Sequence, residues 1–345
     1  MKAAILKKIG KIVIEDIEKP KVQPGHVLIK IDYVGICGSD VHYYEHGRIG
    51  DFVVEKPLIL GHECSGVIEE LGDGVTGFGV GDKVVPEPGF ACNICDFCKT
   101  GKYNLCEEMT FMATPPIDGA FCEYVSYPAD MVFKLPENVT TKEGALIEPL
   151  AIGIYAAKRG GVFPGAKVLV LGAGCIGLVT MLAAKAYGAS EVVITDVLDN
   201  RLKAAKNLGA DFALNTSQKN LHELIADTTG DAGVDVVIDC VGISPTINDA
   251  IDSCKKGGTI VLVGMGSDGN VNINMNRAIS KEIDFTTIFR YRNIFPTALK
   301  MVSDGKIDIN GIVSRSFDFD EIGKAMEFVM NNKQDVVKAI VKIGE

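Results

Sequence analysis

The chain has 345 residues, which is long for one hydrophobic core and short for three, so its length favours two domains. Apolar residues make up 47% and charged residues 23%, which excludes wholesale disorder, collagen and a coiled coil. Lys plus Arg number 35 against 45 for Asp plus Glu, and the net charge of −10 would repel nucleic-acid phosphates and anionic lipid heads. We therefore expect neither nucleic acid nor a membrane as a partner.

The N-terminal residues do not resemble a secretory signal, because Lys7, Lys8 and Lys11 interrupt the apolar start. We accordingly expect a cytoplasmic protein. Residues 168–184 carry no charge and approach the length of a membrane span. Three glycines interrupt this stretch, so it predicts a buried strand, a tight turn and a buried helix face.

The pattern along the chain changes near residue 140. Up to about residue 136, short alternating segments and many glycine turns predict an irregular β-rich domain. A helix is expected over residues 146–159, and strands and helices then alternate with the spacing of βαβ units. The expected strands, which suit a doubly wound parallel sheet, cover residues 167–171, 191–195, 212–214, 234–239, 259–263 and 284–288. The remaining segments are a helical stretch at 294–303, a helix at 320–330 and a strand at 336–343, and they could close either domain.

Gly172, Gly174 and Gly177 form a GxGxxG motif directly after an expected strand and directly before an expected helix. The first glycine permits the tight turn, the second admits a pyrophosphate, and the third allows close packing of helix on strand. Asp196 ends the next strand, where its carboxylate can accept the ribose hydroxyls of an adenosine and would repel the 2′-phosphate of NADP. Arg201 could stack on the adenine or pair with Asp196. The pattern predicts an NAD site, and the alternative is that the glycines only turn the chain while Asp196 caps a helix.

Four cysteines follow one another at short intervals, in the pattern C-x2-C-x2-C-x7-C formed by Cys92, Cys95, Cys98 and Cys106. This spacing predicts a closed, structural zinc site with four thiolate ligands. Two disulfides or an iron–sulfur cluster are the alternatives, but no secretion signal or electron-transfer partner supports either.

A second group of metal-binding residue types is dispersed. Cys37 lies in the segment GICGSD, and His62 and Glu63 follow Gly61. A thiolate, an imidazole and a carboxylate with one open position make up a catalytic zinc site. Each residue also has an ordinary interpretation, with Cys37 and His62 in the core and Glu63 as a surface charge.

Several segments resemble the zinc-dependent medium-chain alcohol dehydrogenases, and within that family they are most similar to the sorbitol dehydrogenases, which act on polyols. The resemblance covers essentially the whole chain and is carried by the four spaced cysteines and by residues 35–50 (GICGSDVHYYEHGRIG), 60–66 (LGHECSG), 143–149 (EGALIEP), 172–177 (GAGCIG) and 289–293 (FRYRN). It implies an α/β protein with a GroES-like β-rich catalytic domain, residues 1–150 and 289–345, and an inserted Rossmann NAD-binding domain, residues 151–288.

The resemblance also implies the composition of the active site. Cys37, His62 and Glu63 would face one catalytic zinc, and Glu148 would approach it directly or through a water. The reaction implied is hydride transfer from a secondary alcohol of a polyol to NAD, giving a ketose as in the conversion of sorbitol to fructose, with zinc lowering the pKa of the substrate hydroxyl. Ser39 and His42 would relay the released proton, although a water held by Glu148 could serve instead.

The remaining implied roles concern substrate and cofactor. The polyol pocket would be lined by Tyr43, Phe111, Thr114, Glu148, Arg290 and Tyr291. The cofactor would contact Ile176 in the glycine turn and, along its nicotinamide half, Val263, Gly264, Met265, Ile288, Phe289 and Arg290.

The four-cysteine motif is a departure from some animal sorbitol dehydrogenases, which lack it, so the fine substrate preference is less secure. Xylitol, arabinitol, galactitol or 2,3-butanediol are alternative substrates, and a binding protein that keeps the fold is the non-enzyme alternative. An exposed edge of the Rossmann sheet and the family both imply a homotetramer or a homodimer.

Overall fold

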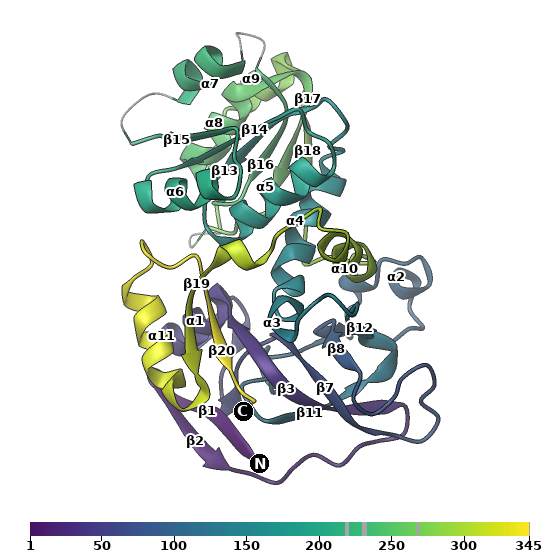
Figure 1. Ribbon diagram of the computed structural model, residues 1–345. Helices are drawn as coiled ribbons and strands as arrows, with labels where there is room; N and C mark the ends of the chain where they lie inside the picture. The colour runs from purple at the N-terminus through teal and green to yellow at the C-terminus, as the bar shows by residue number, and fades with distance from the viewer. Residues whose placement is uncertain (218–220, 230–232, 267–268, 345) are drawn as a thin grey trace. The chain divides into compact units, whose positions relative to one another are not determined.

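The computed structural model describes residues 1–344 except 218–220, 230–232 and 267–268. By its contacts the chain divides into two compact units, which are described separately (Figure 1). Unit 1 contains Met1–Glu148, Phe295–Ser303 and Val313–Glu345, and unit 2 contains Pro149–Ile294 and Asp304–Ile312. Residues 289–294 and 304–312 thus group with unit 2, whereas the sequence analysis places 289–345 as a whole in the other domain. The functional domain boundaries remain a prediction.

Unit 1 is built around a mixed sheet of seven strands, in the order β12-β8-β7-β3-β20-β19, with β11 also pairing with β3. These strands are β3 (His26–Ile36), β7 (Glu63–Leu71), β8 (Lys83–Pro86), β11 (Tyr124–Pro128), β12 (Val132–Lys134), β19 (Val313–Asp318) and β20 (Lys338–Lys342). A second sheet contains β1 (Lys2–Lys8), β2 (Lys11–Asp16) and β6 (Leu58–Ile59), and two short pairs are formed by β4 (Arg48–Ile49) with β5 (Phe52–Val53) and β9 (Gly89–Phe90) with β10 (Thr110–Phe111). Figure 1 shows both chain termini in this unit.

Short helices complete unit 1. They are α1 (Gly38–His46), α2 (Asp96–Lys99), α3 (Thr141–Gly144), α10 (Phe295–Ser303) and α11 (Ile322–Asn331), and α4 (Ile147–Arg159) starts here and continues into unit 2. The core between the sheets is apolar and includes Phe121, Leu6 and Ile29, none of which is more than 1% exposed. Burial of these side chains is the main source of stability in the unit.

Strand β3 is central to unit 1, because it forms antiparallel ladders with β7 on one side and β20 on the other. Gly35 is opposite Glu63 in the first ladder and opposite Ile340 in the second. The end of β3, the beginning of β7 and the beginning of β20 therefore meet at one place, although they come from distant parts of the chain.

Unit 2 contains a parallel sheet of six strands in the order β15-β14-β13-β16-β17-β18. The strands are β13 (Lys167–Leu171), β14 (Glu191–Asp196), β15 (Phe212–Asn215), β16 (Val234–Asp239), β17 (Cys254–Leu262) and β18 (Asp284–Thr287). The helices are α5 (Cys175–Ala186), α6 (Asp199–Asn207), α7 (Leu221–Thr229), α8 (Ser244–Ser253) and α9 (Met275–Ser280), with α5 and α6 on one face of the sheet and α8 and α9 on the other (Figure 1). The strand order reverses between β13 and β16, which is where a doubly wound sheet binds its ligand.

All six expected strands of the parallel sheet are present in the structure. The largest difference is in β17, which begins at Cys254 and not at residue 259. The strand thus includes Gly258, at a place where backbone approaches closely, since an added Cβ would be 2.9 Å from the Asp235 carbonyl oxygen. In the described part of the chain no helix combines the length and apolarity needed to cross a membrane.

Glu87, which follows β8, is a buried acid whose carboxylate accepts a hydrogen bond of 2.8 Å from the Tyr103 hydroxyl. Burial raises the pKa of Glu87 to about 7; the Tyr103 hydrogen bond lowers it and the charge of Glu148 raises it. The folded unit consequently holds this proton more tightly than the unfolded chain does.

This shift gives a stability prediction with a definite sign. Because the folded pKa lies above the unfolded one, the stabilisation by the neutral acid is full below the unfolded pKa and is lost as pH rises through about 7. Glu87→Gln removes the titration. In urea denaturation, the free energy of unfolding of the variant should therefore rise relative to that of the parent between pH 5 and 7.5, by at most about 3 kcal/mol. Glu70→Gln, on an exposed part of β7, is the control. A difference that does not change with pH would contradict the prediction.

Candidate functional site

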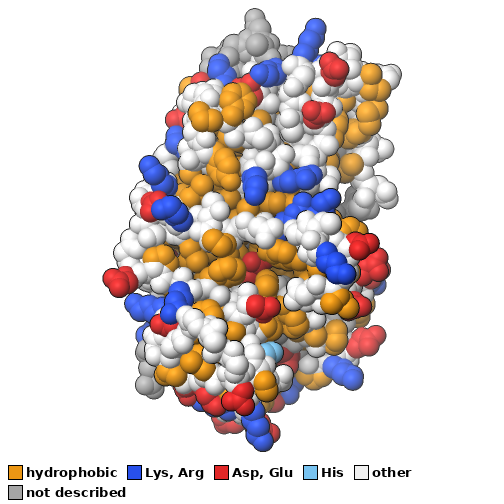
Figure 2. All heavy atoms as spheres, turned by 90° about the vertical axis from the view of Figure 1, so that its right-hand side faces the viewer, with side chains coloured by type: hydrophobic (Ala, Val, Ile, Leu, Met, Phe, Trp, Pro, Cys, Tyr) orange, Lys and Arg blue, Asp and Glu red, His pale blue; other side chains and the backbone are white. Residues whose placement is uncertain are grey.

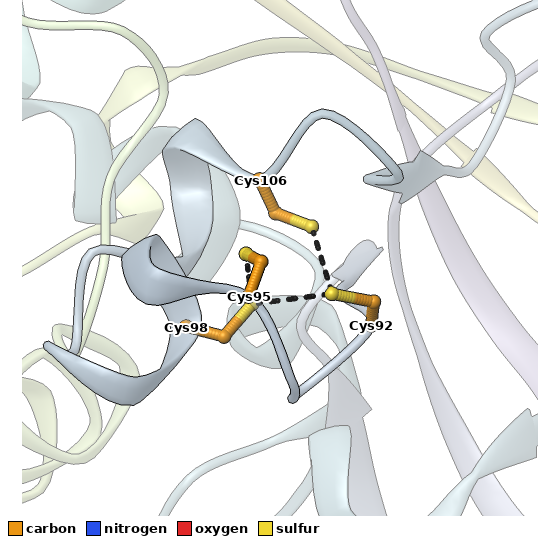
Figure 3. A group of neighbouring side chains, drawn as sticks. All are labelled: Cys92, Cys95, Cys98 and Cys106. Atoms are coloured by element: carbon orange, nitrogen blue, oxygen red, sulfur yellow. Dashed lines mark hydrogen bonds between the residues drawn. The ribbon is translucent and has the colours of Figure 1, made fainter.

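The four spaced cysteines lie together in a small lobe of unit 1 (Figure 3). The sulfur atoms are 3.5 Å apart for Cys95 and Cys98, 3.6 Å for Cys106 and Cys92, and 4.0 Å for Cys92 and Cys98. A tetrahedral zinc with sulfur ligands requires sulfur–sulfur distances of about 3.8 Å. The lobe therefore fits one zinc ion with four thiolate ligands.

Local backbone structure favours thiolate at this lobe. The backbone N–H groups of Ile94 and Cys95 point at the Cys92 sulfur and lower the pKa of its thiol to about 7. All ten cysteines of the chain are free, so none of the four is in a disulfide.

The second group consists of Cys37, His62 and Glu63, whose ligand atoms all lie within 4.8 Å of one another. Cys37 caps the N-terminus of α1 directly after β3, and Glu63 is the first residue of β7. The β3–β7 ladder brings these segments together. A thiolate, an imidazole nitrogen and a carboxylate oxygen at this spacing fit a divalent metal such as zinc and leave a fourth position for another ligand.

The electrostatics of this group also favour a cation. Burial on its own lowers the pKa of His62, but the negative charges of Cys37, Asp40 and Glu148 outweigh it and raise the pKa to about 10. Without a metal, His62 would therefore take up a proton as a counter-charge. A bound divalent cation would supply that positive charge and displace the proton.

Asp40 supports both ligand segments and was overlooked in the sequence. One carboxylate oxygen accepts from the Cys37 N–H at 2.9 Å, and the other accepts from the Gly61 N–H at 2.9 Å and lies 3.8 Å from Nδ1 of His62. A carboxylate behind a ligating histidine orients the ring and increases its basicity. Its position three residues after the N-cap of α1 was the local signal that could have found it.

The other residues expected near this group lie at different depths in unit 1. Glu148 is buried and close enough for its charge to act on His62, but it is not among the three described residues grouped within 4.8 Å. The Phe111 ring centroid lies 5.6 Å from that of His62, and Thr114 donates its N–H to the Phe111 carbonyl. The remaining expected residues are Tyr43, which is buried, Ser39, which is half-buried, and His42, which is exposed on α1.

The glycine motif in unit 2 forms a tight turn at the end of β13. Gly172 has φ = +93°, and an added Cβ there would come within 2.7 Å of the Val241 side chain. A Cβ at Gly177 would overlap the Gly172 carbonyl oxygen, whereas Gly174, the N-cap of α5, has no close neighbour. The first and third glycines are thus required by the fold, and the second leaves the helix N-terminus open for a phosphate.

Asp196 lies beside this turn at the end of β14. Its carboxylate accepts from the backbone N–H groups of Ala173 at 2.9 Å and Leu198 at 3.0 Å, and Nη1 of Arg201 is 3.5 Å away. These contacts hold the carboxylate next to the open end of α5. A ribose could therefore be bound by Asp196 while its phosphate lies at the helix N-terminus.

The other expected cofactor residues follow the strand ends in unit 2. Val263 and Gly264 donate their N–H groups to the Asp239 carbonyl, and Ile288 donates to Leu262. Met265 is 82% exposed, Ile176 is half-buried in the first turn of α5, and the Arg290 guanidinium lies 5.0 Å from the centre of the Phe289 ring. Arg290 has φ = +54°, and Tyr291 next to it is buried. Val263, Gly264 and Ile288 thus line the carboxyl edge of the sheet, and a dinucleotide binds at such an edge.

Lys338 in β20 is a second residue that sequence reasoning missed. Its Nζ lies 2.7 Å from each carboxylate oxygen of Glu63, and the side chain is buried. A lysine at the start of the apolar run of β20 was the signal in the sequence, and it did not indicate a partner. On the molecular face drawn in Figure 2, acidic and basic side chains are both present and neither covers the face.

Comparison with known proteins identifies both parts of the chain. Residues 23–137 match the alcohol dehydrogenase GroES-like domain, and residues 175–304 match the zinc-binding dehydrogenase family. The predicted fold class, a GroES-like domain with a Rossmann-type parallel sheet, is thereby confirmed.

Individual relatives cover nearly the full chain. Sorbitol dehydrogenase of Bacillus subtilis is 41% identical over 99% of this chain and 97% of its own, and L-idonate 5-dehydrogenase of Vitis vinifera is 44% identical over 88% and 83%. Among solved structures, an Escherichia coli oxidoreductase/dehydrogenase of unknown specificity has a TM-score of 0.96 at 39% identity, covering 100% of this chain and 99% of its own. The 2R,3R-butanediol dehydrogenase of Bacillus subtilis has a TM-score of 0.91 at 34% identity, covering 99% of both chains.

Metal analysis tests the two groups separately. Purified parent protein should contain two zinc ions per chain, Cys37→Ser should lose one, and Cys92→Ser should lose the other. The second variant should also melt at a lower temperature, because zinc binding contributes to folding of the lobe. Cys122→Ala, a core cysteine outside both groups, should keep both ions. Full zinc content in Cys37→Ser would contradict the assignment of its site.

Proposed function

The chain belongs to the zinc-binding medium-chain alcohol dehydrogenases, and on that basis we propose that this zinc-dependent dehydrogenase oxidises a secondary hydroxyl of a polyol to a ketose with NAD, as in the conversion of sorbitol to fructose. The observation that carries the proposal is the grouping of Cys37, His62 and Glu63 within 4.8 Å. Such a donor set leaves a position for substrate.

Each of these residues has a defined part in the proposed reaction. Zinc and the nicotinamide, when bound, supply a Lewis acid for the substrate hydroxyl and an acceptor for hydride. Cys37, His62 and Glu63 would hold the metal, and Asp40 accepts the Cys37 and Gly61 N–H groups and so fixes the segments that carry these ligands. Glu148, whose charge reaches His62, would bind through a water or a second substrate hydroxyl.

The environment of the group supports a substrate that is both polar and carbon-rich. The Phe111 ring beside His62 offers an apolar surface, and the Glu148 charge acts on His62. We propose that Tyr43 adds a hydroxyl to this environment. We propose that Thr114, Arg290 and Tyr291 add further contacts to substrate hydroxyls. Sorbitol, idonate and butanediol in the names of the relatives all contain a secondary alcohol.

The released proton requires a path to solvent, and α1 offers one. Ser39 is half-buried two residues after Cys37, and His42 is exposed one turn further along, with its ring 4.6 Å from that of His46. We propose that the proton passes from Ser39 to His42 and on to water.

The choice of polyol can be tested by NADH absorbance in steady-state kinetics with sorbitol, xylitol, galactitol and 2,3-butanediol. We expect kcat/KM to be highest for a polyol of five or six carbons, because Glu148 and the neighbouring polar groups would bind several hydroxyls. A preference for the short diol would replace the polyol assignment with that of a diol dehydrogenase.

Cofactor preference depends on Asp196. Its replacement in Asp196→Ala removes a charge-assisted pair of hydrogen bonds to the ribose, so kcat/KM for NAD should fall by roughly 10- to 100-fold while that for NADP changes little. Asp199→Ala, at the exposed start of α6, is the matched control. An unchanged ratio between the two cofactors would show that Asp196 does not select NAD.

We further propose a homodimer or homotetramer in a reducing compartment such as the cytoplasm. The outer edge of β18 pairs with no other strand in the described part of the chain, and Phe285 on it is 36% exposed. The ten cysteines form no disulfide, which suits a reducing compartment. Sedimentation velocity would decide the subunit number.

A further inference from the structure

Lys338 and Glu63 form a buried ion pair below the group that we propose to bind the catalytic metal. The Lys338 ammonium lies 2.7 Å from Oε1 and 2.7 Å from Oε2 of Glu63, and 3.1 Å from the Ile36 carbonyl oxygen. Lys338 is 3% exposed and Glu63 1%. Burying a lysine and a carboxylate costs free energy that hydrophobic residues of the same size would not, so stability alone does not explain the pair.

Glycine at position 35 makes the contact possible. Glu63 in β7 and Lys338 in β20 lie on opposite sides of β3, and Gly35 of β3 is directly opposite Glu63. A Cβ added at Gly35 would overlap Oε2 of Glu63, which shows that the carboxylate lies over this glycine. The missing side chain leaves the space through which the carboxylate reaches Lys338.

The geometry leaves Glu63 able to bind a metal at the same time. An ammonium has three protons, and here they point to the two carboxylate oxygens and the Ile36 carbonyl. Each carboxylate oxygen has two lone pairs, so one on each remains after the lysine is bound. The Glu63 oxygen grouped with Cys37 and His62 can therefore face a metal while Lys338 holds the carboxylate from the other side.

We propose that Lys338 is a positioning residue that fixes the Glu63 carboxylate toward Cys37 and His62 and thereby raises the affinity of this site for zinc. The inference rests on the proposed function, which assigns these three residues to a metal. Lys338 also places a positive charge beside the Glu63 carboxylate and so offsets part of the negative charge gathered around the site. It touches neither substrate nor cofactor in this role.

The test measures zinc affinity at each site by competition with a chelator. Lys338→Met should weaken the Cys37 site by about 10- to 100-fold, the usual effect of losing a residue that orients a ligand, and should leave the four-cysteine site unchanged. Lys338→Arg keeps the cation and should recover part of the affinity. Lys185→Met, which removes the cation 2.9 Å from Asp211 in unit 2, is the matched control and should have no effect.

Two further measurements separate positioning from a general structural role. Cobalt placed in the Cys37 site should show a changed visible spectrum in Lys338→Met, since Glu63 would be held differently. In a Glu63→Ala background, Lys338→Met should cause no additional loss of zinc affinity. Wild-type affinity and spectrum in Lys338→Met, or an equal loss in both backgrounds, would overturn the proposal.

Gly35→Ala gives an independent test that keeps both charges and remains decisive if Lys338→Met does not fold. The added methyl group would displace the Glu63 carboxylate from Lys338, and zinc affinity at the Cys37 site should fall as it does in Lys338→Met. Unchanged affinity in Gly35→Ala would contradict the proposal. Failure of the proposed function would look different, because the parent protein would then hold one zinc or oxidise none of the alcohols tested.

Discussion

The candidate active site depends on the position of β3 between β7 and β20. Its two antiparallel ladders set Gly35 opposite both Glu63 and Ile340, and β3 then ends next to Cys37. Side chains alternate between the two faces of a strand, so a shift of either ladder by one residue would turn Glu63 or Lys338 to the other face. Packing of Val27, Ile29 and Ile31 of β3 in the apolar core favours this register.

The two metal-binding groups solve different physical problems. The four-cysteine lobe collects its ligands within fifteen residues of chain, and backbone N–H groups lower the pKa of the Cys92 thiol. The Cys37 group instead gathers charged side chains inside the core of unit 1, where each charge requires a partner. The Asp40 carboxylate accepts the Gly61 N–H and the Glu63 carboxylate pairs with Lys338, so both are held by protein groups and not by solvent.

Most of the parallel sheet and the four-cysteine lobe could be predicted from the sequence, because their signals are local. Apolar runs and the glycine turn lie within a few residues of what they specify, and so does the cysteine spacing. The early start of β17 was missed, because the close backbone approach at Gly258 depends on the neighbouring strand and has no local signature. The grouping of Cys37, His62 and Glu63 came from a family resemblance, since it depends on a strand pairing that no local pattern determines.

Long-range contacts were beyond sequence reasoning for the same reason. Lys338 carries no local sign of its partner, and Gly35 gives no sign that its missing side chain makes room for Glu63. Asp40 is the exception, since its place in the first turn of α1 is a capping position that could have been recognised.

The separation of Glu63 and Lys338 has a consequence for how the protein is made. The two residues are 275 positions apart, and Lys338 lies in the last strand of the chain. At an elongation rate of about 5–20 residues per second, the ribosome would synthesise Lys338 roughly 15 to 55 seconds after Glu63. The nascent chain must also leave the exit tunnel before β20 can join the sheet. The ion pair at the Cys37 site can therefore form only after residue 338 has been synthesised, whereas the four-cysteine lobe has all its ligands once residue 106 has been made.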